Sequence, residues 1–181
     1  HRVDRRQRQM CIRDRFIGFH LANKLLHAGY QVIGVDSLND AYDVRLKSLR
    51  IGELKNNEKY EFHQLDLSNP DSISQLHEIN SDAQVFYHMA ARAGVRQSFL
   101  DPYSYVLDNT VATTNVANYC KLTEISSLIL ASTSSIYGDS GESLMRENKD
   151  ERIKPPSVYA STKLSGEILA KTILDESNTK V

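Results

Sequence analysis

Residues 16–36 have the sequence FIGFHLANKLLHAGYQVIGVD, in which a helical pattern is followed by a strand pattern. Apolar side chains recur at helical spacing at Ile17, Leu21, Leu25 and Ala28. Gly29 comes next, and glycine tolerates the left-handed conformation that often ends a helix. Residues 31–35 form an apolar run of strand length that ends in Asp36. The segment therefore predicts one helix followed by one buried strand.

The same alternation continues along the rest of the chain. Further strand patterns lie at residues 60–65, 84–89 and 128–131, and helical patterns lie at 43–55, 69–79, 103–121 and 159–174. Short strands that alternate with helices are typical of βαβ units around a mostly parallel sheet. We therefore expect one doubly wound α/β domain with a polar surface loop at 138–157. Residues 179–181 could begin another strand, so we expect the domain to be cut at this end.

Composition and charge exclude several classes of protein. The chain has 181 residues, 40% of them hydrophobic, which suffices for one domain with a real core. The first 15 residues hold six Arg and two Asp, so the remaining 166 carry 16 basic and 21 acidic side chains. An acidic body of this kind argues against nucleic acid as a partner, because such proteins need a basic face.

Cysteine content and hydropathy bear on location. Cys11 and Cys120 are the only cysteines, so we expect no disulfide framework and a reducing, cytoplasmic compartment. No apolar run approaches the roughly 20 residues that cross a bilayer, and no signal peptide is recognisable. We expect neither a membrane nor a metal partner.

The strongest chemical signal is Tyr159-Ala160-Ser161-Thr162-Lys163. A spacing of four places the tyrosine and lysine side chains on one helix face, one turn apart. A free tyrosine loses its proton only near pH ~10, and a neighbouring cation favours the phenolate that a general base needs. The alternative is a helix surface on which the two residues meet by chance.

Two further elements lie at the predicted carboxyl ends of strands, where open α/β sheets bind ligands. Residues 131–138, ASTSSIYG, place hydroxyls that could hydrogen-bond a substrate oxygen, although an ordinary Ser/Thr turn is equally compatible. Asp36 could accept hydrogen bonds from both hydroxyls of an adenosine ribose and repel a 2′-phosphate, which favours NAD over NADP. A plain turn or helix cap is the alternative for Asp36, and also for Asp66 after the next strand.

A glycine loop before the first helix is missing. The pattern G-x-x-G-x-x-G, anchored on Gly18, would need glycines where this chain has Ile12 and Arg15. Glycines are required there because the backbone turns tightly and approaches a pyrophosphate. Residues 1–15 have few apolar side chains and no strand alternation, and they look like translated vector or adapter sequence. We therefore expect residues 1–15 to be a non-native leader.

Together these motifs, in this order, resemble the extended short-chain dehydrogenase/reductase family of NAD-dependent nucleotide-sugar epimerases and dehydratases. Residues 36–47, DSLNDAYDVRLK, and 88–96, HMAARAGVR, are most similar to its UDP-glucuronate 4-epimerase branch. The resemblance implies a Rossmann-like, doubly wound parallel sheet that is truncated. The first strand and glycine loop would be replaced and the C-terminal substrate domain would be missing. Residues 16–181 would be a partial NAD-binding domain.

The resemblance also assigns roles to residues. Phe16, Ile17 and Gly18 would flank the pyrophosphate, Asp36, Ser37 and Asn39 would face the adenosine ribose, Asp66 and Leu67 would lie beside the adenine, and Ala90, Ala91 and Ala93 would line the cofactor by backbone. Thr133 would be the catalytic hydroxyl with Ser134 and Ser135 beside it, Tyr159 the base, and Lys163 its ribose-binding partner. The guanidinium groups of Arg96 and Arg92 could pair with a sugar carboxylate or diphosphate, and arginines that merely lie at the solvated surface are the alternative.

The implied reaction is 4-epimerisation of UDP-glucuronate to UDP-galacturonate through a 4-keto sugar. The family's dehydratases carry an Asp-Glu pair where this chain has Ser134 and Ser135, so an epimerase is favoured. Other UDP-sugar 4-epimerases, a dehydratase, and a module that merely binds NAD or a sugar nucleotide remain alternatives. The resemblance implies a homodimer for the intact protein, and we expect the 181-residue chain itself to be inactive.

Overall fold

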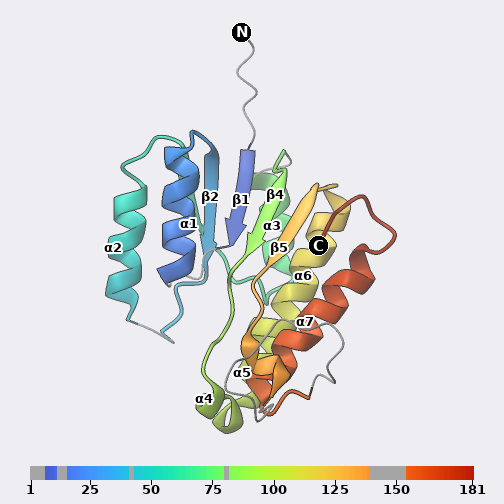
Figure 1. Cartoon of the computed structure of the whole chain (residues 1–181). Helices are drawn as coiled ribbons and strands as arrows, with labels where there is room; N and C mark the ends of the chain where they lie inside the picture. Colours follow the sequence, from blue (N-terminus) through green and yellow to red (C-terminus); the bar gives the residue numbers. More distant parts are fainter. Residues whose placement is uncertain (1–6, 12–15, 41–42, 80–81, 139–153) are drawn as a thin grey trace.

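The computed structural model describes residues 7–11, 16–40, 43–79, 82–138 and 154–181, without the side chains of 7–11. Five strands form one parallel sheet in the order β3-β2-β1-β4-β5 (Figure 1). The strands are β1 (Gln7–Cys11), β2 (Gln31–Asp36), β3 (Tyr60–Gln64), β4 (Val85–His88) and β5 (Ser127–Leu130). The parallel sheet predicted from the alternating patterns is therefore confirmed.

Helices cover both faces of the sheet. They are α1 (Phe16–His27), α2 (Val44–Leu54), α3 (Asp71–Ile79), α4 (Val95–Leu100), α5 (Pro102–Tyr105), the π-helix η1 (Val106–Val111), α6 (Ala112–Leu122), the 3₁₀ turn η2 (Ser134–Tyr137) and α7 (Val158–Leu174). One core joins α1 and α2 to the sheet around Phe19 and Val32. The other joins α3, α6 and α7 to it around Phe86 and Leu128. This is the expected doubly wound arrangement.

Helix ends follow the local signals in the sequence. Gly29 has φ +88°, which a glycine adopts without strain, directly after α1. The side chain of Asp43 caps α2 by accepting from the amide of Arg45 at 3.0 Å. Ser157 caps α7 by accepting from the amide of Ala160 at 3.1 Å. These caps satisfy backbone N–H groups that have no partner within the helix.

The leader contains the one strand that we did not expect. Residues 7–11 form β1 between β2 and β4, although their sequence lacks a strand pattern. Gln9 lies opposite both Ile33 and Phe86, so neighbours on both sides supply backbone hydrogen bonds. A central position in a parallel sheet can thus impose an extended conformation on residues of low strand propensity. The foreign origin of the leader stays a prediction, and residues 12–15 lie outside the described part.

The predicted helix over 103–121 is divided into α5, η1 and α6. A π-helical turn inserts one extra residue per turn, and such turns are frequent at functional sites. The short elements α4 and η2 were not anticipated, because six residues or fewer carry too little periodicity to be recognised. Of the predicted loop 138–157, residues 139–153 lie outside the described part.

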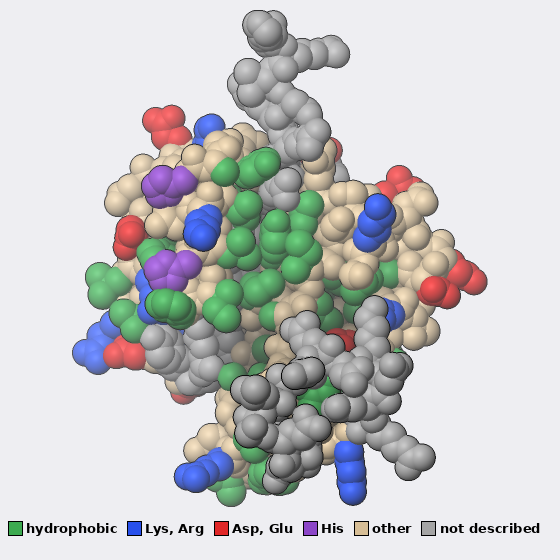
Figure 2. Space-filling model, in the orientation of Figure 1, with side chains coloured by type: hydrophobic (Ala, Val, Ile, Leu, Met, Phe, Trp, Pro, Cys, Tyr) green, Lys and Arg blue, Asp and Glu red, His purple; other side chains and the backbone are tan. Residues whose placement is uncertain are grey.

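One face of the sheet carries exposed apolar side chains, and its edge strand β5 has a further pairing partner. Beside α1, apolar side chains gather over the strands on the face shown in Figure 2. Ile129 of β5 belongs to this face, since its neighbours in the strand, Leu128 and Leu130, point to the opposite core, and it is 43% exposed. Lys180 forms an isolated parallel bridge to Ser127, so the segment after α7 pairs with β5 at the edge of the sheet. Across the described ranges, no helix is long and apolar enough to cross a membrane.

Candidate active site

A cavity opens where β2, β3 and β4 end, at the edge of the sheet toward which all arrowheads point in Figure 1. It contains about 380 Å³ of empty space, including its open mouth. Its walls are formed by Val35, Asp36, Ser37, Asn39, Leu65, Asp66, Leu67, Ala90, Ala91, Asp108 and Ala112. The space is a hollow that is open to solvent, and both polar and apolar side chains form its walls.

The structure brings most of the predicted cofactor residues together in this cavity. Three segments supply them, 36–39, 66–67 and 90–91, which lie far apart in the sequence but follow β2, β3 and β4 at the same edge of the sheet. Connections from β1 and from β3 run to opposite faces of the sheet, so the cavity lies at the topological switch point. Sequence analysis missed Asp108 and Ala112, which reach the cavity from the helical segment after α5.

Asp36 is held by a buried ion pair. Its Oδ1 accepts from the amide of Leu38 at 2.6 Å and from Nζ of Lys47 at 3.2 Å. The Lys47 ammonium also donates to the carbonyl of Asn39 at 3.1 Å. The side chains of Lys47 and Asp36 are 0% and 2% exposed. Lys47 on α2 therefore braces the loop that carries the predicted ribose contacts, in which Leu38 adopts a left-handed φ of 52°.

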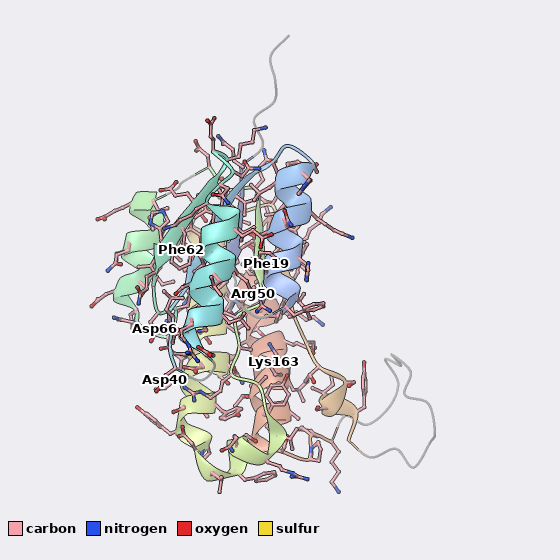
Figure 3. All side chains as sticks on the ribbon, turned by 90° about the vertical axis from the view of Figure 1, so that its left-hand side faces the viewer. Phe19, Asp40, Arg50, Phe62, Asp66 and Lys163 are labelled. Carbon is pink, nitrogen blue, oxygen red and sulfur yellow. The ribbon has the colours of Figure 1, made fainter. Side chains whose placement is uncertain are left out.

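Asp66 shapes a turn and also lies in the cavity wall. Its Oδ1 accepts from the amide and the hydroxyl of Ser68 at 3.0 and 2.8 Å, so it shapes the turn after β3. Its side chain faces the cavity between β2, β3 and β4, and Figure 3 labels it beside the lower end of α2. A turn-forming carboxylate can thus still present its charge to a ligand.

Tyr159 and Lys163 lie one turn apart on α7. Tyr159 is half-buried, and its ring packs edge-on against that of Tyr105 at a centroid distance of 6.3 Å. Lys163 is only 4% exposed, and Figure 3 shows it in the interior of the molecule. Burial lowers the pKa of Lys163 from 10.5 to about 8, although the nearby charge of Glu167 partly opposes this. The ammonium is therefore still protonated at neutral pH.

The hydroxyl segment after β5 packs against the same helix. Thr133 caps η2, and its Oγ1 accepts from the amide of Ser135 at 3.2 Å. The hydroxyl of Ser132 donates to the carboxylate of Glu167, which links this segment to α7. Ser134 is exposed and Ser135 half-buried. The fold thus brings the hydroxyl cluster to the helix that carries the tyrosine and lysine.

Asn109, which the sequence did not single out, joins the cavity to α7. Its side-chain amide accepts from the amide of Arg92 at 2.6 Å and donates to the carbonyl of the same residue at 3.1 Å. It also donates to Oγ1 of Thr162 at 3.0 Å. Asn109 is 1% exposed and lies within the π-helical turn. It holds the loop after β4 against the helix of Tyr159.

His88 lies behind this network and is fully buried. Nε2 of His88 is 3.0 Å from Oγ1 of Thr113, whose own proton goes to the carbonyl of Asn109 at 2.5 Å. The Thr113 hydroxyl therefore accepts, and Nε2 of His88 carries the proton. Burial first, and the charge of Lys163 second, lower the pKa of His88 to about 3. Its Nδ1 has no hydrogen-bond partner within the described ranges.

The two arginines differ in their surroundings. Nε of Arg92 pairs with Oδ2 of Asp108 at 2.7 Å, and its guanidinium lies 5.9 Å from the centroid of the Tyr105 ring. Arg96 is exposed on α4. Arg92 therefore has partners within the protein, whereas Arg96 is exposed to solvent.

The remaining predicted residues lie outside the cavity wall. Phe16 and Ile17 are each 68% exposed at the start of α1, whereas Gly18 is buried. The carbonyl of Ala93 accepts from the hydroxyl of Tyr105 at 2.9 Å. The distance of Phe16, Ile17 and Gly18 from a pyrophosphate depends on residues 12–15, which lie outside the described part.

A doubly wound sheet with a strand-end cavity, a buried carboxylate after β2 and a Tyr-Lys pair on α7 defines an α/β protein of the short-chain dehydrogenase type. The chain belongs to the NAD dependent epimerase/dehydratase family, whose model matches residues 14–181. The resemblance stated from the motifs is therefore confirmed.

Relatives and solved structures agree with this assignment. The chain is 42% identical over 157 residues to a UDP-glucuronate 4-epimerase of Thermodesulfobacterium geofontis, covering 87% of this chain and 48% of that protein. It is 40% identical to protein CapI of Staphylococcus aureus, with 87% and 46% covered. It superposes on UDP-glucuronic acid 4-epimerase from Bacillus cereus, solved with UDP-glucuronic acid and NAD. The TM-score is 0.84 and the identity 32%, over 97% of this chain and 55% of that one. The chain thus spans about half the length of these proteins.

Proposed function

We propose that a protein carrying this chain catalyses the NAD-dependent 4-epimerisation of a nucleotide sugar, with UDP-glucuronate converted to UDP-galacturonate through a 4-keto sugar. The observation that carries the proposal is the packing of the Thr133 segment against the helix of Tyr159 and Lys163, beside a strand-end cavity. The names of the relatives support the choice of sugar.

The cavity would hold the adenosine half of NAD. Asp36, Ser37 and Asn39 would hold the ribose, Asp66 and Leu67 would lie beside the adenine, and Ala90 and Ala91 would approach by backbone. Lys163 would donate to the second ribose, consistent with a lysine that is 4% exposed yet protonated at neutral pH. When bound, NAD supplies the acceptor for the C4 hydride and returns it.

The side chains of this chain would manage the proton. Tyr159, as phenolate, would take the proton of the C4 hydroxyl, while the Lys163 cation stabilises the phenolate. Thr133 would hydrogen-bond the same oxygen, with Ser134 and Ser135 toward the sugar. Because no acidic pair follows Thr133, water loss has no obvious catalyst, which favours the epimerase over the dehydratase. Other UDP-sugar 4-epimerases and a non-catalytic NAD or sugar-nucleotide module remain the competing proposals.

Arg96 remains our candidate for the sugar carboxylate or diphosphate, because its guanidinium is exposed. Arg92 is the weaker candidate, since binding a ligand would cost its pairing with Asp108. We further propose a cytoplasmic location and a homodimer through α5–α6 and α7, whose outer faces include Tyr103 and Ile168 at 71% and 56% exposed.

The test of turnover uses residues 16–181 joined to the corresponding end segments of the Thermodesulfobacterium relative. We expect conversion of UDP-glucuronate to UDP-galacturonate, followed by proton NMR, and a loss of at least about 100-fold in Tyr159→Phe. Tyr30→Phe, between α1 and β2 and outside the cavity wall, is the matched control and should keep the wild-type rate. Full activity of Tyr159→Phe would contradict the proposed mechanism. Activity with UDP-glucose alone would favour the competing epimerase.

The leader gives a separate expectation for the 181-residue chain as it stands. Ile12 and Arg15 occupy positions where the family has glycines, so we propose that this chain binds whole NAD weakly and does not turn over substrate. Calorimetry with NAD measures this directly, and micromolar binding would contradict it.

A further inference from the structure

We propose that Glu167 is a positioning residue of the proposed active site, because its carboxylate holds the segment of Thr133 to α7 and also supplies the counter-charge for Lys163. Two elements of the proposed chemistry thus share one anchor, which would act through them and not on the substrate itself. The inference rests on the proposed function, because it takes the roles of Thr133 and Lys163 from there.

The first step is the anchor of the hydroxyl segment. The hydroxyl of Ser132 donates to Oε1 of Glu167, which joins the chain shortly after β5 to α7. Thr133 is the next residue, and its Oγ1 caps η2 by accepting from the amide of Ser135 at 3.2 Å. The turn η2 also packs against α7. The bond to Glu167 therefore fixes the start of the turn that carries Thr133.

The second step is the position of the same carboxylate along α7. Tyr159, Lys163 and Glu167 follow one another at intervals of four residues, so their side chains leave one face of the helix, one turn apart. Lys163 is 4% exposed, and among the described residues no carboxylate forms an ion pair with it at contact distance. The charge that acts on its ammonium is that of Glu167, and it opposes the effect of burial. Glu167 therefore partly compensates a buried cation from one turn away.

The third step is the consequence of this charge for the chemistry. The pKa of Lys163 is about 8, close to neutral pH, so a further fall would leave part of the molecules without the ammonium. The phenolate of Tyr159 needs that cation beside it. The charge of Lys163 also reaches His88 of β4, but the pKa of His88 is about 3, so its ring is uncharged near neutral pH. Of the described groups around the ammonium, Glu167 is thus the one that helps to keep it protonated.

The experiment measures the pKa of Lys163 in the full 181-residue chain by pH titration of its Cε–Hε NMR signal, which Lys163→Met identifies by removing it. Glu167→Gln removes the charge and keeps an oxygen that accepts from Ser132. We expect this variant to lower the pKa of Lys163 by at least about 0.3, the size of an i,i+4 ion pair on a helix surface. Glu176→Gln, which removes an exposed carboxylate just after α7, is the matched control and should leave this pKa unchanged.

The anchor is tested separately by hydrogen exchange of the Ser135 amide, which donates to Thr133 within the turn. Glu167→Ala removes the acceptor of Ser132, so this amide should exchange at least about fivefold faster, the value of one lost hydrogen bond. Glu167→Gln should keep the exchange rate close to that of the wild type. If amide dispersion shows that Glu167→Ala is unfolded, Ser132→Ala takes its place, since it removes the donor and leaves α7 unchanged.

Three results would overturn the inference. An unchanged pKa of Lys163 in Glu167→Gln would show that Glu167 is not its counter-charge. An equal fall in Glu176→Gln would show an effect of net charge instead of position. An unchanged exchange rate of the Ser135 amide in the variant without the anchor would show that the carboxylate does not hold the turn. None of these measurements needs turnover, so they can fail independently of the proposed function, which Tyr159→Phe tests.

Discussion

Replacing Lys163 by methionine should stabilise the fold while it removes a residue of the proposed catalytic pair. Lys163 is 4% exposed, and its pKa falls from 10.5 to about 8, chiefly because burial disfavours the ammonium. Each pKa unit corresponds to about 1.4 kcal/mol, so holding the charge costs the folded state about 3 kcal/mol near neutral pH. Methionine has a similar length and no charge, and replacing a buried ion by an apolar side chain is often stabilising.

The pH dependence of the stability difference shows whether the charge of Lys163 causes it. Because the folded pKa is the lower one, the unfolded chain binds more protons between pH 8 and 10.5, and wild-type stability rises with pH in that window. The advantage of Lys163→Met should therefore be about 3 kcal/mol at pH 7 and shrink by about 2 kcal/mol at pH 9.5. Cys120 acts in the opposite sense, since burial raises its pKa from 9.0 to about 12, but it is present in both proteins and cancels.

Urea unfolding followed by circular dichroism at pH 7 and 9.5 measures both quantities. Lys171→Met, an exposed lysine two turns further along α7, is the matched control and should change stability little at either pH. A variant less stable than the wild type at pH 7, or an advantage that is the same at both pH values, would refute the reasoning. In an active protein the same lysine titration predicts that turnover declines above about pH 8.

Two further predictions concern residues outside the proposed chemistry. His88 has a pKa of about 3 in the folded protein, so on acidification the unfolded chain takes up this proton first. The free energy of unfolding should therefore fall below pH 6.5 by up to about 1.4 kcal/mol per pH unit. Urea unfolding between pH 4 and 7 measures this slope, and His88→Gln should lose much of it. A Cβ added at Gly34 would lie 2.3 Å from the hydroxyl of the buried Tyr60, so Gly34→Ala should cost about 1 to 3 kcal/mol in thermal or urea unfolding. Gly52→Ala, where a Cβ meets nothing within 4 Å on helix α2, should be neutral or stabilising, and equal losses at both glycines would contradict the packing account.

The order and type of the main elements could be predicted because their signals are local. The helix that ends at Gly29 and the strand that ends at Asp36 were located to within a residue or two, since periodicity, caps and glycine all lie within the element itself. The edge of the sheet at which the cavity lies could also be predicted, because parallel strands bring their carboxyl ends to one edge. The roles of the residues there remain proposals.

What could not be predicted depends on partners distant in the sequence. Asp36 at the end of β2 pairs with Lys47 of α2, a helix of ordinary polar composition. In the sequence of such a helix, a buried lysine cannot be told apart from a surface lysine. Asn109 bonds to Arg92 and Thr162, and the π-helical turn that aims it has no local signal. The leader shows the converse, because β1 depends on its two neighbours rather than on its own residues.

These long-range contacts divide the proposed site into parts with separate determinants. The adenosine part rests on the Asp36–Lys47 pair, within the segment from β2 to α2. The tyrosine part rests on α7 and its bond to Asn109, which ties it to the loop after β4. The contacts that the structure describes for both parts lie outside residues 12–15, where the pyrophosphate would be held. Substitutions in that loop should therefore weaken binding of a whole dinucleotide far more than binding of its adenosine half. For this chain, a comparison of its affinity for 5′-AMP with its affinity for NAD tests whether the replaced glycine loop weakens dinucleotide binding.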